Sequence, residues 1–215
     1  TAGKIVNNEA ATLTIKDSVI GVTIQNKGTL ISDPNTYTAR HTNSGTATYN
    51  GDTFKDITST GLNGGAIYNT GTITNGIGGI FIDNTVTDMG GAILVSSGGA
   101  EELKIQDNSL FKGNYASYGG AILSGGSLNI GKNVRFIDNI GYGSGPGGAI
   151  LGTTVNIDDG AVFEGNIDNG YGAGECLCCP GYCRRTLRQP GTGIWQRRRV
   201  VQLGTGRGRS DYCGT

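Results

Sequence analysis

Gly-Gly-Ala-Ile at residues 119–122, followed by Phe-Ile-Asp-Asn at residues 136–139, is the stretch that decides the fold. The tetrad Gly-Gly-Ala-Ile occurs four times, at intervals of 26, 29 and 28 residues, and a Phe-x-x-Asn follows each copy. Self-similarity at a period of this length predicts stacked structural repeats, in which each unit contacts only its neighbours. The copies are Gly64–Ile67 with Phe81–Asn84, Gly90–Ile93 with Phe111–Asn114, Gly119–Ile122 with Phe136–Asn139, and Gly147–Ile150 with Phe163–Asn166.

The residues around the two motifs alternate between apolar and polar side chains over short stretches, separated by Gly, Asn, Asp, Ser and Thr. Such alternation predicts short β-strands joined by turns, and no stretch has the apolar period of a helix. Three strands and three turns per repeat indicate an all-β fold, a parallel β-helix (solenoid) of about 27 residues per coil. The alternating elements assigned to equivalent places are Thr72-Ile73-Thr74, Leu103-Lys104-Ile105, Leu128-Asn129-Ile130 and Val155-Asn156-Ile157.

Equivalent side chains of successive coils are expected to form rows along the axis. The Ile of each tetrad should form one inward row, the Phe of each Phe-x-x-Asn a second row of stacked rings, and the paired glycines a tight corner. The Asn is expected at a turn in a left-handed conformation, bonding the backbone or the next Asn. Phe54, ten residues before the first tetrad, is interpreted as an outlying member of the Phe row. Upstream, Leu13–Ile15, Val19–Ile20 and Val22–Ile24 predict one or two irregular coils.

Charge and composition divide the chain into unlike parts. Residues 1–174 carry 9 basic and 15 acidic side chains, whereas residues 175–215 carry 8 Arg, 2 acidic residues, all five Cys and the only Trp. We therefore predict irregular N-terminal coils over 1–53, regular β-helix repeats over 54–173 and a Cys/Arg-rich tail over 174–215. The sequence contains no run of 18 apolar residues, so it predicts no membrane-spanning helix. Because the chain begins at Thr1, without an initiator Met or a signal peptide, we interpret it as a mature or internal fragment.

Gly-Gly-Ala-Ile alternating with Phe-x-x-Asn resembles the repeat signature of the polymorphic outer membrane proteins of chlamydiae and of related autotransporter passengers. The resemblance covers roughly residues 54–166 and includes four copies of both motifs in register. It implies a right-handed β-helix on a bacterial surface, exported with a signal peptide and a C-terminal β-barrel translocator, and often acting in adhesion.

Carboxylates are the first candidates for catalysis, because polysaccharide lyases and hydrolases share the β-helix fold and resemble one another in clustering Asp with Lys or Arg on one face. Asp83 and Asp138 occupy the same repeat position, but Gly113 holds that place in the coil between them. Two coils span roughly 9.6 Å, and no Lys or Arg stands at matched positions, so turn residues are the favoured interpretation. The pairs Glu101-Glu102 and Asp158-Asp159 are likewise predicted to be solvated turn charges.

His41 is the only His, and its Thr- and Asn-rich surroundings predict a surface position. No Gly-Gly-x-Gly-x-Asp nonapeptide for calcium occurs, and no Gly-rich stretch leads into a helix that could hold a phosphate. An ice-binding face would need Thr-x-Thr in register on every coil, and Thr72-Ile73-Thr74 has no counterpart at Leu128 or Val155. The sequence therefore predicts no catalytic residue, no metal ligand and no cofactor.

The tail contains Cys176-Leu177-Cys178-Cys179 and Cys183, a spacing that is not standard for zinc. An odd number of Cys leaves one unpaired if the others form disulfides, and Arg197–Arg199 could bind an anionic surface. We favour a frameshift: codons for residues 194–199, read one base later, can spell Tyr-Gly-Ser-Gly-Gly-Ala, close to the run at 142–149. The tail is then non-native or disordered, and a genuine small Cys-rich module is the alternative.

The sequence as a whole favours a non-catalytic fragment of a surface-exposed or secreted bacterial β-helix, an adhesin or structural passenger. Its expected partners are a surface protein or glycan of a host or neighbouring cell, with no nucleic acid and no membrane insertion by this segment. The expected location is extracellular or on the outer membrane surface. The alternative is a fragment of a carbohydrate-active β-helix enzyme, which would show adjacent carboxylates and a basic residue in a groove, whereas smooth rows of Thr, Asn and Ser favour the scaffold.

Overall fold

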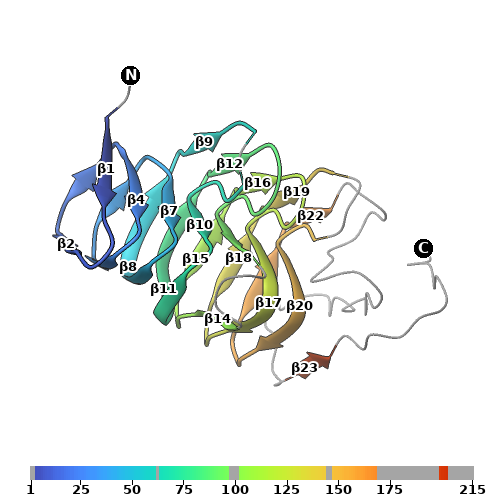
Figure 1. Ribbon diagram of the computed structural model, residues 1–215. Helices are drawn as coiled ribbons and strands as arrows, with labels where there is room; N and C mark the ends of the chain where they lie inside the picture. Colours follow the sequence, from blue (N-terminus) through green and yellow to red (C-terminus); the bar gives the residue numbers. More distant parts are fainter. Residues whose placement is uncertain (1–2, 62, 97–101, 144–146, 169–198, 203–215) are drawn as a thin grey trace, which may run out of the picture.

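The computed structural model describes residues 3–61, 63–96, 102–143, 147–168 and 199–202. This part of the chain is all-β without a helix, and its strands stack as successive coils of a parallel β-helix, as predicted (Figure 1). One sheet has 18 strands and a smaller one has five, β22-β19-β16-β12-β9. The strands are β1 (Lys4–Asn7), β2 (Thr12–Lys16), β3 (Val19–Ile20), β4 (Thr23–Asn26), β5 (Thr29–Asp33), β6 (Thr36–Tyr37), β7 (His41–Asn43), β8 (Thr46–Lys55), β9 (Thr58–Ser59), β10 (Ile67–Asn69), β11 (Thr72–Ile82), β12 (Thr85–Val86), β13 (Ile93–Val95), β14 (Glu102–Ile105), β15 (Leu110–Lys112), β16 (Tyr115–Ala116), β17 (Ile122–Ile130), β18 (Arg135–Ile137), β19 (Ile140–Gly141), β20 (Ile150–Ile157), β21 (Val162–Glu164), β22 (Ile167–Asp168) and β23 (Arg199–Gln202).

The inward Ile row predicted from the tetrads is confirmed. Ile67, Ile93, Ile122 and Ile150 pair in parallel register and are fully buried. The row extends toward the N-terminus, where Ile67 pairs with His41 and His41 pairs with Ile24. The core is therefore built from rows that run along the axis of the solenoid.

The stacked Phe row is confirmed as well, including its outlying member Phe54. Phe54 pairs with Phe81 in register, and their ring centroids lie 5.1 Å apart with planes 3° from parallel. The rings of Phe81, Phe111, Phe136 and Phe163 continue the stack at 4.7 to 4.9 Å. At the N-terminal end, Tyr37 stacks on Phe54 at 4.8 Å, so the row begins with a Tyr. Each offset pair adds a favourable contact to the burial of the rings.

The glycine pair forms the expected corner, and each Gly has its own reason to be there. Gly90 has a φ of 66°, which a side chain would strain. Gly91 has an ordinary φ, but a Cβ on it would lie 1.9 Å from the carbonyl oxygen of Gly120 in the next coil. The first glycine supplies a left-handed turn and the second allows two coils to approach closely.

The Asn of Phe-x-x-Asn forms the predicted contact with the next Asn, but the prediction of its left-handed backbone was wrong. The left-handed residue is the one before it: φ is 52° at Asp83 and Asp138, 64° at Gly113 and 63° at Gly165. That residue turns the chain outward, and the Asn that follows points into the interior, where it is buried. Asn84, Asn114, Asn139 and Asn166 form the C-terminal Asn ladder, with Nδ2 to Oδ1 distances of 3.0, 2.9 and 2.8 Å.

The alternating elements are equivalent in three coils, and the fourth assignment was wrong. Residues 103–105, 128–130 and 155–157 pair in register. Residue Ile77, rather than Thr74, pairs with Ile105, because β11 is irregular between Ile73 and Ile77. Thr72 pairs instead with Thr46 in the preceding coil. Rows therefore continue from the regular repeats into the N-terminal coils.

The upstream coils predicted from residues 13–24 are present as β2, β3 and β4. Their steps are short: paired Asn residues lie 19 and 17 residues apart at Asn7, Asn26 and Asn43, against 26 from Asn43 to Asn69. The Cys/Arg-rich tail, with its five Cys and the frameshift hypothesis, lies outside the described residues except for β23. That strand pairs antiparallel with β20.

Candidate functional site

The sequence-predicted carboxylates are placed at turns and not in a shared site. Asp83 and Asp138 are exposed residues with a left-handed backbone, in coils separated by that of Gly113. A Cβ at Gly113 would lie 2.1 Å from Oδ1 of Asp83, so the Asp83 carboxylate leans over the glycine of the next coil. Asp138 leans over Gly165 in the same way, again at 2.1 Å. The position carries Asp in some coils and Gly in others, because both residue types tolerate a left-handed conformation.

The described residues of the acidic pairs Glu101-Glu102 and Asp158-Asp159 also lie at the surface. Asp158 and Asp159 are exposed, and Glu102 is exposed and accepts a hydrogen bond from Nδ2 of Asn129, while Glu101 lies outside the described residues. Among the described residues no three His, Cys, Asp or Glu side chains gather into a group that could hold a metal ion.

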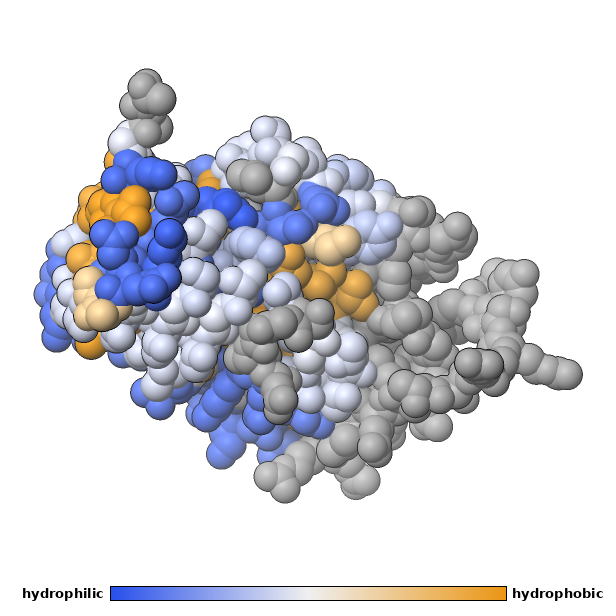
Figure 2. Space-filling view, in the orientation of Figure 1, coloured by the Kyte–Doolittle hydropathy of each residue, from blue (hydrophilic) through white to orange (hydrophobic). Residues whose placement is uncertain are grey.

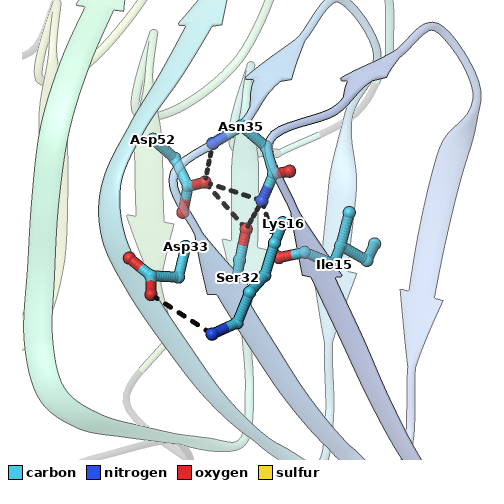
Figure 3. A network of polar contacts seen from close by, with 6 residues as sticks. All are labelled: Ile15, Lys16, Ser32, Asp33, Asn35 and Asp52. Atoms are coloured by element: carbon cyan, nitrogen blue, oxygen red, sulfur yellow. Dashed lines mark hydrogen bonds and ion pairs between the residues drawn. The ribbon is translucent and has the colours of Figure 1, made fainter.

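Chemistry-bearing side chains gather instead inside the N-terminal coils, from strands β5 to β8. We call this group the N-terminal polar cluster. Asp52 is its centre: Oδ1 accepts from Oγ of Ser32 at 2.8 Å and from the main-chain N–H of Asn35 at 2.8 Å (Figure 3). Nδ2 of Asn35 donates to the carbonyl of Ile15 at 2.9 Å and to Oγ of Ser32 at 3.0 Å, which ties the cluster to the first coil. The members are Ser32, Asn35, Tyr37, His41, Tyr49 and Asp52.

Burial governs the ionisation of the cluster. It raises the pKa of Asp52 to about 6, although the hydrogen bonds from Ser32 and Asn35 oppose the shift. It also raises the pKa of the phenols of Tyr37 and Tyr49 above their ordinary value. Tyr37 shares a hydrogen bond of 2.6 Å with Oγ of Ser32, whereas the Tyr49 hydroxyl and Oδ2 of Asp52 are buried without a hydrogen-bonding partner in the described chain.

His41 is the clearest failure of the sequence prediction, because it is fully buried and not at the surface. Its ring occupies the Ile row between Ile24 and Ile67 and packs edge-on against Tyr37, with centroids 4.2 Å apart. Neither ring nitrogen has a hydrogen-bonding partner among the described residues. Burial lowers the pKa of His41 from its ordinary 6.5 to about 3, so the imidazole is neutral at pH 7.

All members of the polar cluster are buried, and a surface hollow lies beside the cluster. This shallow surface hollow of about 410 Å³ lies at one corner of the first coils and is lined by residues of turns and of strands β3, β6 and β8. Asn35 is its only member shared with the cluster, and Asp52, His41 and Tyr49 do not line it. Asp52 and His41 are 0% exposed, so in the described part of the chain this hollow does not reach the buried carboxylate or the imidazole. The lining residues are Asp17, Ser18, Val19, Pro34, Asn35, Thr36, Gly51 and Thr53.

The outer surface of the same coils is ordered in rows too. Thr12, Thr29, Thr46 and Thr72 pair in register, and we call them the threonine row. All four are exposed or half-buried, and the inward row beside them is Leu13, Leu30, Ala47 and Ile73. Thr14, Ile31 and Thr48 form a second outward row two residues along the strands. Counterparts of Thr72 and Ile73 thus exist in the coils on the N-terminal side, although none exists at Leu128 or Val155.

Figure 2 shows the hydropathy of one face of the molecule. The N-terminal coils are largely hydrophilic in that view, and hydrophobic residues gather in separate patches. The exposed large hydrophobic side chains are Val6, Val19, Ile80, Tyr115 and Ile167.

A second buried Asn ladder was missed from the sequence, although a signal for it is present. Asn7, Asn26, Asn43 and Asn69 form this N-terminal Asn ladder, with Nδ2 to Oδ1 distances of 2.7, 2.6 and 2.6 Å. Three of its members begin an Asn-x-Gly-Thr motif, at residues 26–29, 43–46 and 69–72. The same motif places the threonine row, because its Thr is the outward residue three positions after the ladder Asn.

Comparisons with known proteins do not assign the chain: no family model, no curated protein and no solved structure matches it. The described part of the chain has no helix of the length and apolarity needed to span a membrane. What the fold and surface define is therefore a parallel β-helix with an ordered outer face and a sealed polar interior.

Proposed function

We propose that this chain is part of a non-catalytic, surface-exposed or secreted bacterial β-helix that acts as an adhesin or structural passenger. The observation that carries the proposal is the threonine row, four outward uncharged side chains in register on successive coils. β-Branched side chains are stiff at χ1, and the Asn ladders and the Ile row hold the strands beneath them. Such a face offers an extended contact surface rather than a pocket.

The location and the partner class rest on the repeat motifs. The resemblance of Gly-Gly-Ala-Ile and Phe-x-x-Asn to chlamydial-type outer membrane passengers supports a place on the bacterial surface or outside the cell. A rigid polar face of this kind suits a protein or glycan on a host or neighbouring cell, because many small contacts along a repeat surface add to one another.

The carbohydrate-active enzyme is the weaker candidate because its best residues have another explanation. Asp83 and Asp138 supply left-handed turns, a task that Gly113 and Gly165 perform at the same position. The buried Asp52 lies in a closed interior.

Adhesion is tested with beads that carry the full chain, presented to cultured epithelial cells and to a glycan array. The double variant Thr29→Lys with Thr46→Lys places charge on the threonine row. The matched control, Ser127→Lys with Thr154→Lys, changes paired residues of β17 and β20 in later coils. We expect binding by the wild type, about a tenfold loss in the threonine variant and little loss in the control.

Two results would count against the proposal. If coated beads bind no better than uncoated beads, the proposed adhesive function is contradicted. If both double variants lose binding equally, the threonine row is not the contact surface. Release of reducing ends from a panel of polysaccharides by the full chain would favour the enzyme.

A further inference from the structure

His41 stands where every other aligned position of its row carries Ile. Its strand β7 is paired with β4 on one side and β10 on the other. Two residues further along, Asn43 donates to Asn69 and accepts from Asn26 in the N-terminal Asn ladder. A disturbance at the His41 ring therefore reaches the hydrogen-bond ladder of three coils through one short strand.

The surroundings of His41 suit a neutral ring and provide nothing for a charged one. Tyr37 and Phe54 meet the imidazole edge-on at centroid distances of 4.2 and 5.0 Å, and Tyr49 lies 6.0 Å away. An imidazolium has two N–H donors, and in the closed coils both would lie in an apolar and aromatic space without an acceptor. Contacts of a cation with aromatic rings offset only part of the loss of hydration.

The titratable and charged groups nearby do not compensate a charge on His41. Asp52, on β8, directs Oδ1 to Ser32 and Asn35, and burial alone accounts for the lowered pKa of His41, with no contribution from a carboxylate. The phenols of Tyr37 and Tyr49 stay protonated because burial raises their pKa. Arg40, the preceding residue, carries a positive charge and donates to the carbonyls of Asn63 and Gly64.

We propose that His41 is an acid trigger: its protonation opens the coils formed by β4 to β8, while the coils that carry the C-terminal Asn ladder stay closed. Once the coils open, the imidazole reaches water and regains its ordinary affinity for a proton. The pKa of His41 is lower in the closed coils than in the open ones, so the contribution of His41 to the closed state is fully present above pH 6.5 and is lost as the pH falls toward 3. The extra proton that His41 binds in the open state makes opening about tenfold easier per pH unit in this window, and the titration of Asp52 opposes this effect between pH 4 and pH 6.

Opening is confined to the N-terminal coils because the two halves of the interior differ in their polar groups. Buried side-chain atoms without a partner occur at His41, Tyr49, Asp52 and Asn63, all before the second tetrad. Among the described residues of the later coils no buried side-chain nitrogen or oxygen lacks a partner, and Asn114 and Asn139 each bond both the next Asn and a Phe carbonyl. The trigger would also dismantle the threonine row, which lies on β2, β5, β8 and β11, but the proposal does not depend on adhesion.

Hydrogen exchange of the full chain, followed by mass spectrometry between pH 4 and pH 7, tests the trigger. Wild type is compared with His41→Ile at each pH, so that the intrinsic dependence of exchange on pH cancels in the ratio. Ile at position 41 has precedents in register at Ile24 and Ile67. We expect the ratio of exchange rates in peptides from residues 23–55 to rise by about tenfold per pH unit as the pH falls below 6, and to stay flat in peptides from residues 108–140.

A second variant separates titration from packing. His41→Gln keeps a polar side chain that does not titrate, and it should open more easily than His41→Ile at every pH, without the acid slope. Asp52→Asn removes a group whose titration opposes that of His41 between pH 4 and pH 6, so its acid slope should be steeper than that of the wild type. An unchanged acid slope in His41→Ile, a slope in His41→Gln, or equal acid opening in residues 108–140 would each overturn the proposal.

Discussion

Nδ2 of Asn84 donates to Oδ1 of Asn114 at 3.0 Å, and the main-chain N–H of Asn84 donates to the same oxygen at 3.2 Å. The next two links repeat both bonds, from Asn114 to Asn139 and from Asn139 to Asn166. Each of these amides also reaches back to a Phe carbonyl, as Asn114 does to Phe81 at 3.0 Å. The bonds between the Asn side chains therefore run in one direction: each Asn donates to the next Asn on its C-terminal side and accepts from the Asn on its N-terminal side.

Asn114→Ala should be among the most destabilising single changes in the later coils. Its removal leaves the N–H and Nδ2 of Asn84 and the carbonyl of Phe81 buried without their partner. We expect a loss of about 3 kcal/mol in the free energy of unfolding, because each orphaned buried group costs about 1–3 kcal/mol. Urea denaturation measures it, with the exposed neighbour Lys112→Ala as a control that should change stability by less than about 0.5 kcal/mol. Equal effects at the two positions would show that the ladder does not stabilise the coil.

The Phe row predicts a gradient of mutational effects along the axis. Phe111 is fully buried between Phe81 and Phe136 at 4.8 and 4.9 Å, whereas Phe163 is only half-buried at the last described coil. Phe111→Ala should lower the free energy of unfolding by about 4 kcal/mol, as expected for a buried ring that leaves a cavity. Phe163→Ala should cost about half as much by the same area argument. Thermal and urea denaturation of both variants would reveal the gradient, and a larger loss at Phe163 would contradict it.

The left-handed turn at Asp138 allows catalysis and conformation to be separated at one residue. Asp138→Gly should leave stability almost unchanged, because Gly113 and Gly165 already occupy the equivalent place. Asp138→Val should cost about 1–3 kcal/mol, since a β-branched residue is strained at a φ of 52°. The stability of both variants is measured by urea denaturation. In a separate assay, the folded variants and the wild type are incubated with polysaccharides. If the wild type released reducing sugar and Asp138→Gly did not, the residue would be catalytic and not a turn former.

The regular coils were predictable because the same residue occupies a row in every coil. Ile67 and Ile93, or Phe81 and Phe111, are identical in type, so the rows can be identified from the sequence and the structure confirms them. The error at the left-handed position arose because Asn and Asp share a tolerance for that conformation. Sequence preference alone could not decide which of Asp83 and Asn84 adopts it.

The N-terminal coils were harder to predict because their rows change residue type and their spacing is irregular. His41 follows Ile24 in the Ile row, and Tyr37 precedes Phe54 in the Phe row. Asn26 and Asn43 lie 17 residues apart and Asn43 and Asn69 lie 26 apart, so a constant period does not align them. The polar cluster contains Ser32, Asn35 and Asp52, residue types that are usually found in turns, and here they are buried. Their burial depends on how the neighbouring strands pair, which the irregular spacing conceals in the sequence.

Asp52 gives the protein a dependence on pH that opposes that of His41. Burial raises the pKa of Asp52 from 3.8 to about 6, so the folded state binds more protons than the unfolded state between these values. Its contribution to stability is fully present below pH 3.8 and is lost as the pH rises through 6. The loss amounts to about 3 kcal/mol, since one pKa unit corresponds to about 1.4 kcal/mol. His41 weakens the fold toward acid, so the two effects offset each other between pH 4 and pH 6.

Asp52→Asn should therefore stabilise the chain more at pH 7.5 than at pH 4, by about 2–3 kcal/mol. The amide oxygen can still accept from Ser32 and Asn35, as Oδ1 of Asp52 does, while the group that resists ionisation is gone. Urea denaturation across this pH range measures the difference, in a His41→Ile background so that the imidazole does not titrate. Asp33→Asn is the control, because Asp33 is a surface carboxylate 3.9 Å from Lys16 and its replacement should give only a small effect at any pH. A difference between Asp52→Asn and its parent that stays constant from pH 4 to pH 7.5 would mean that Asp52 is not held away from water as the buried cluster requires.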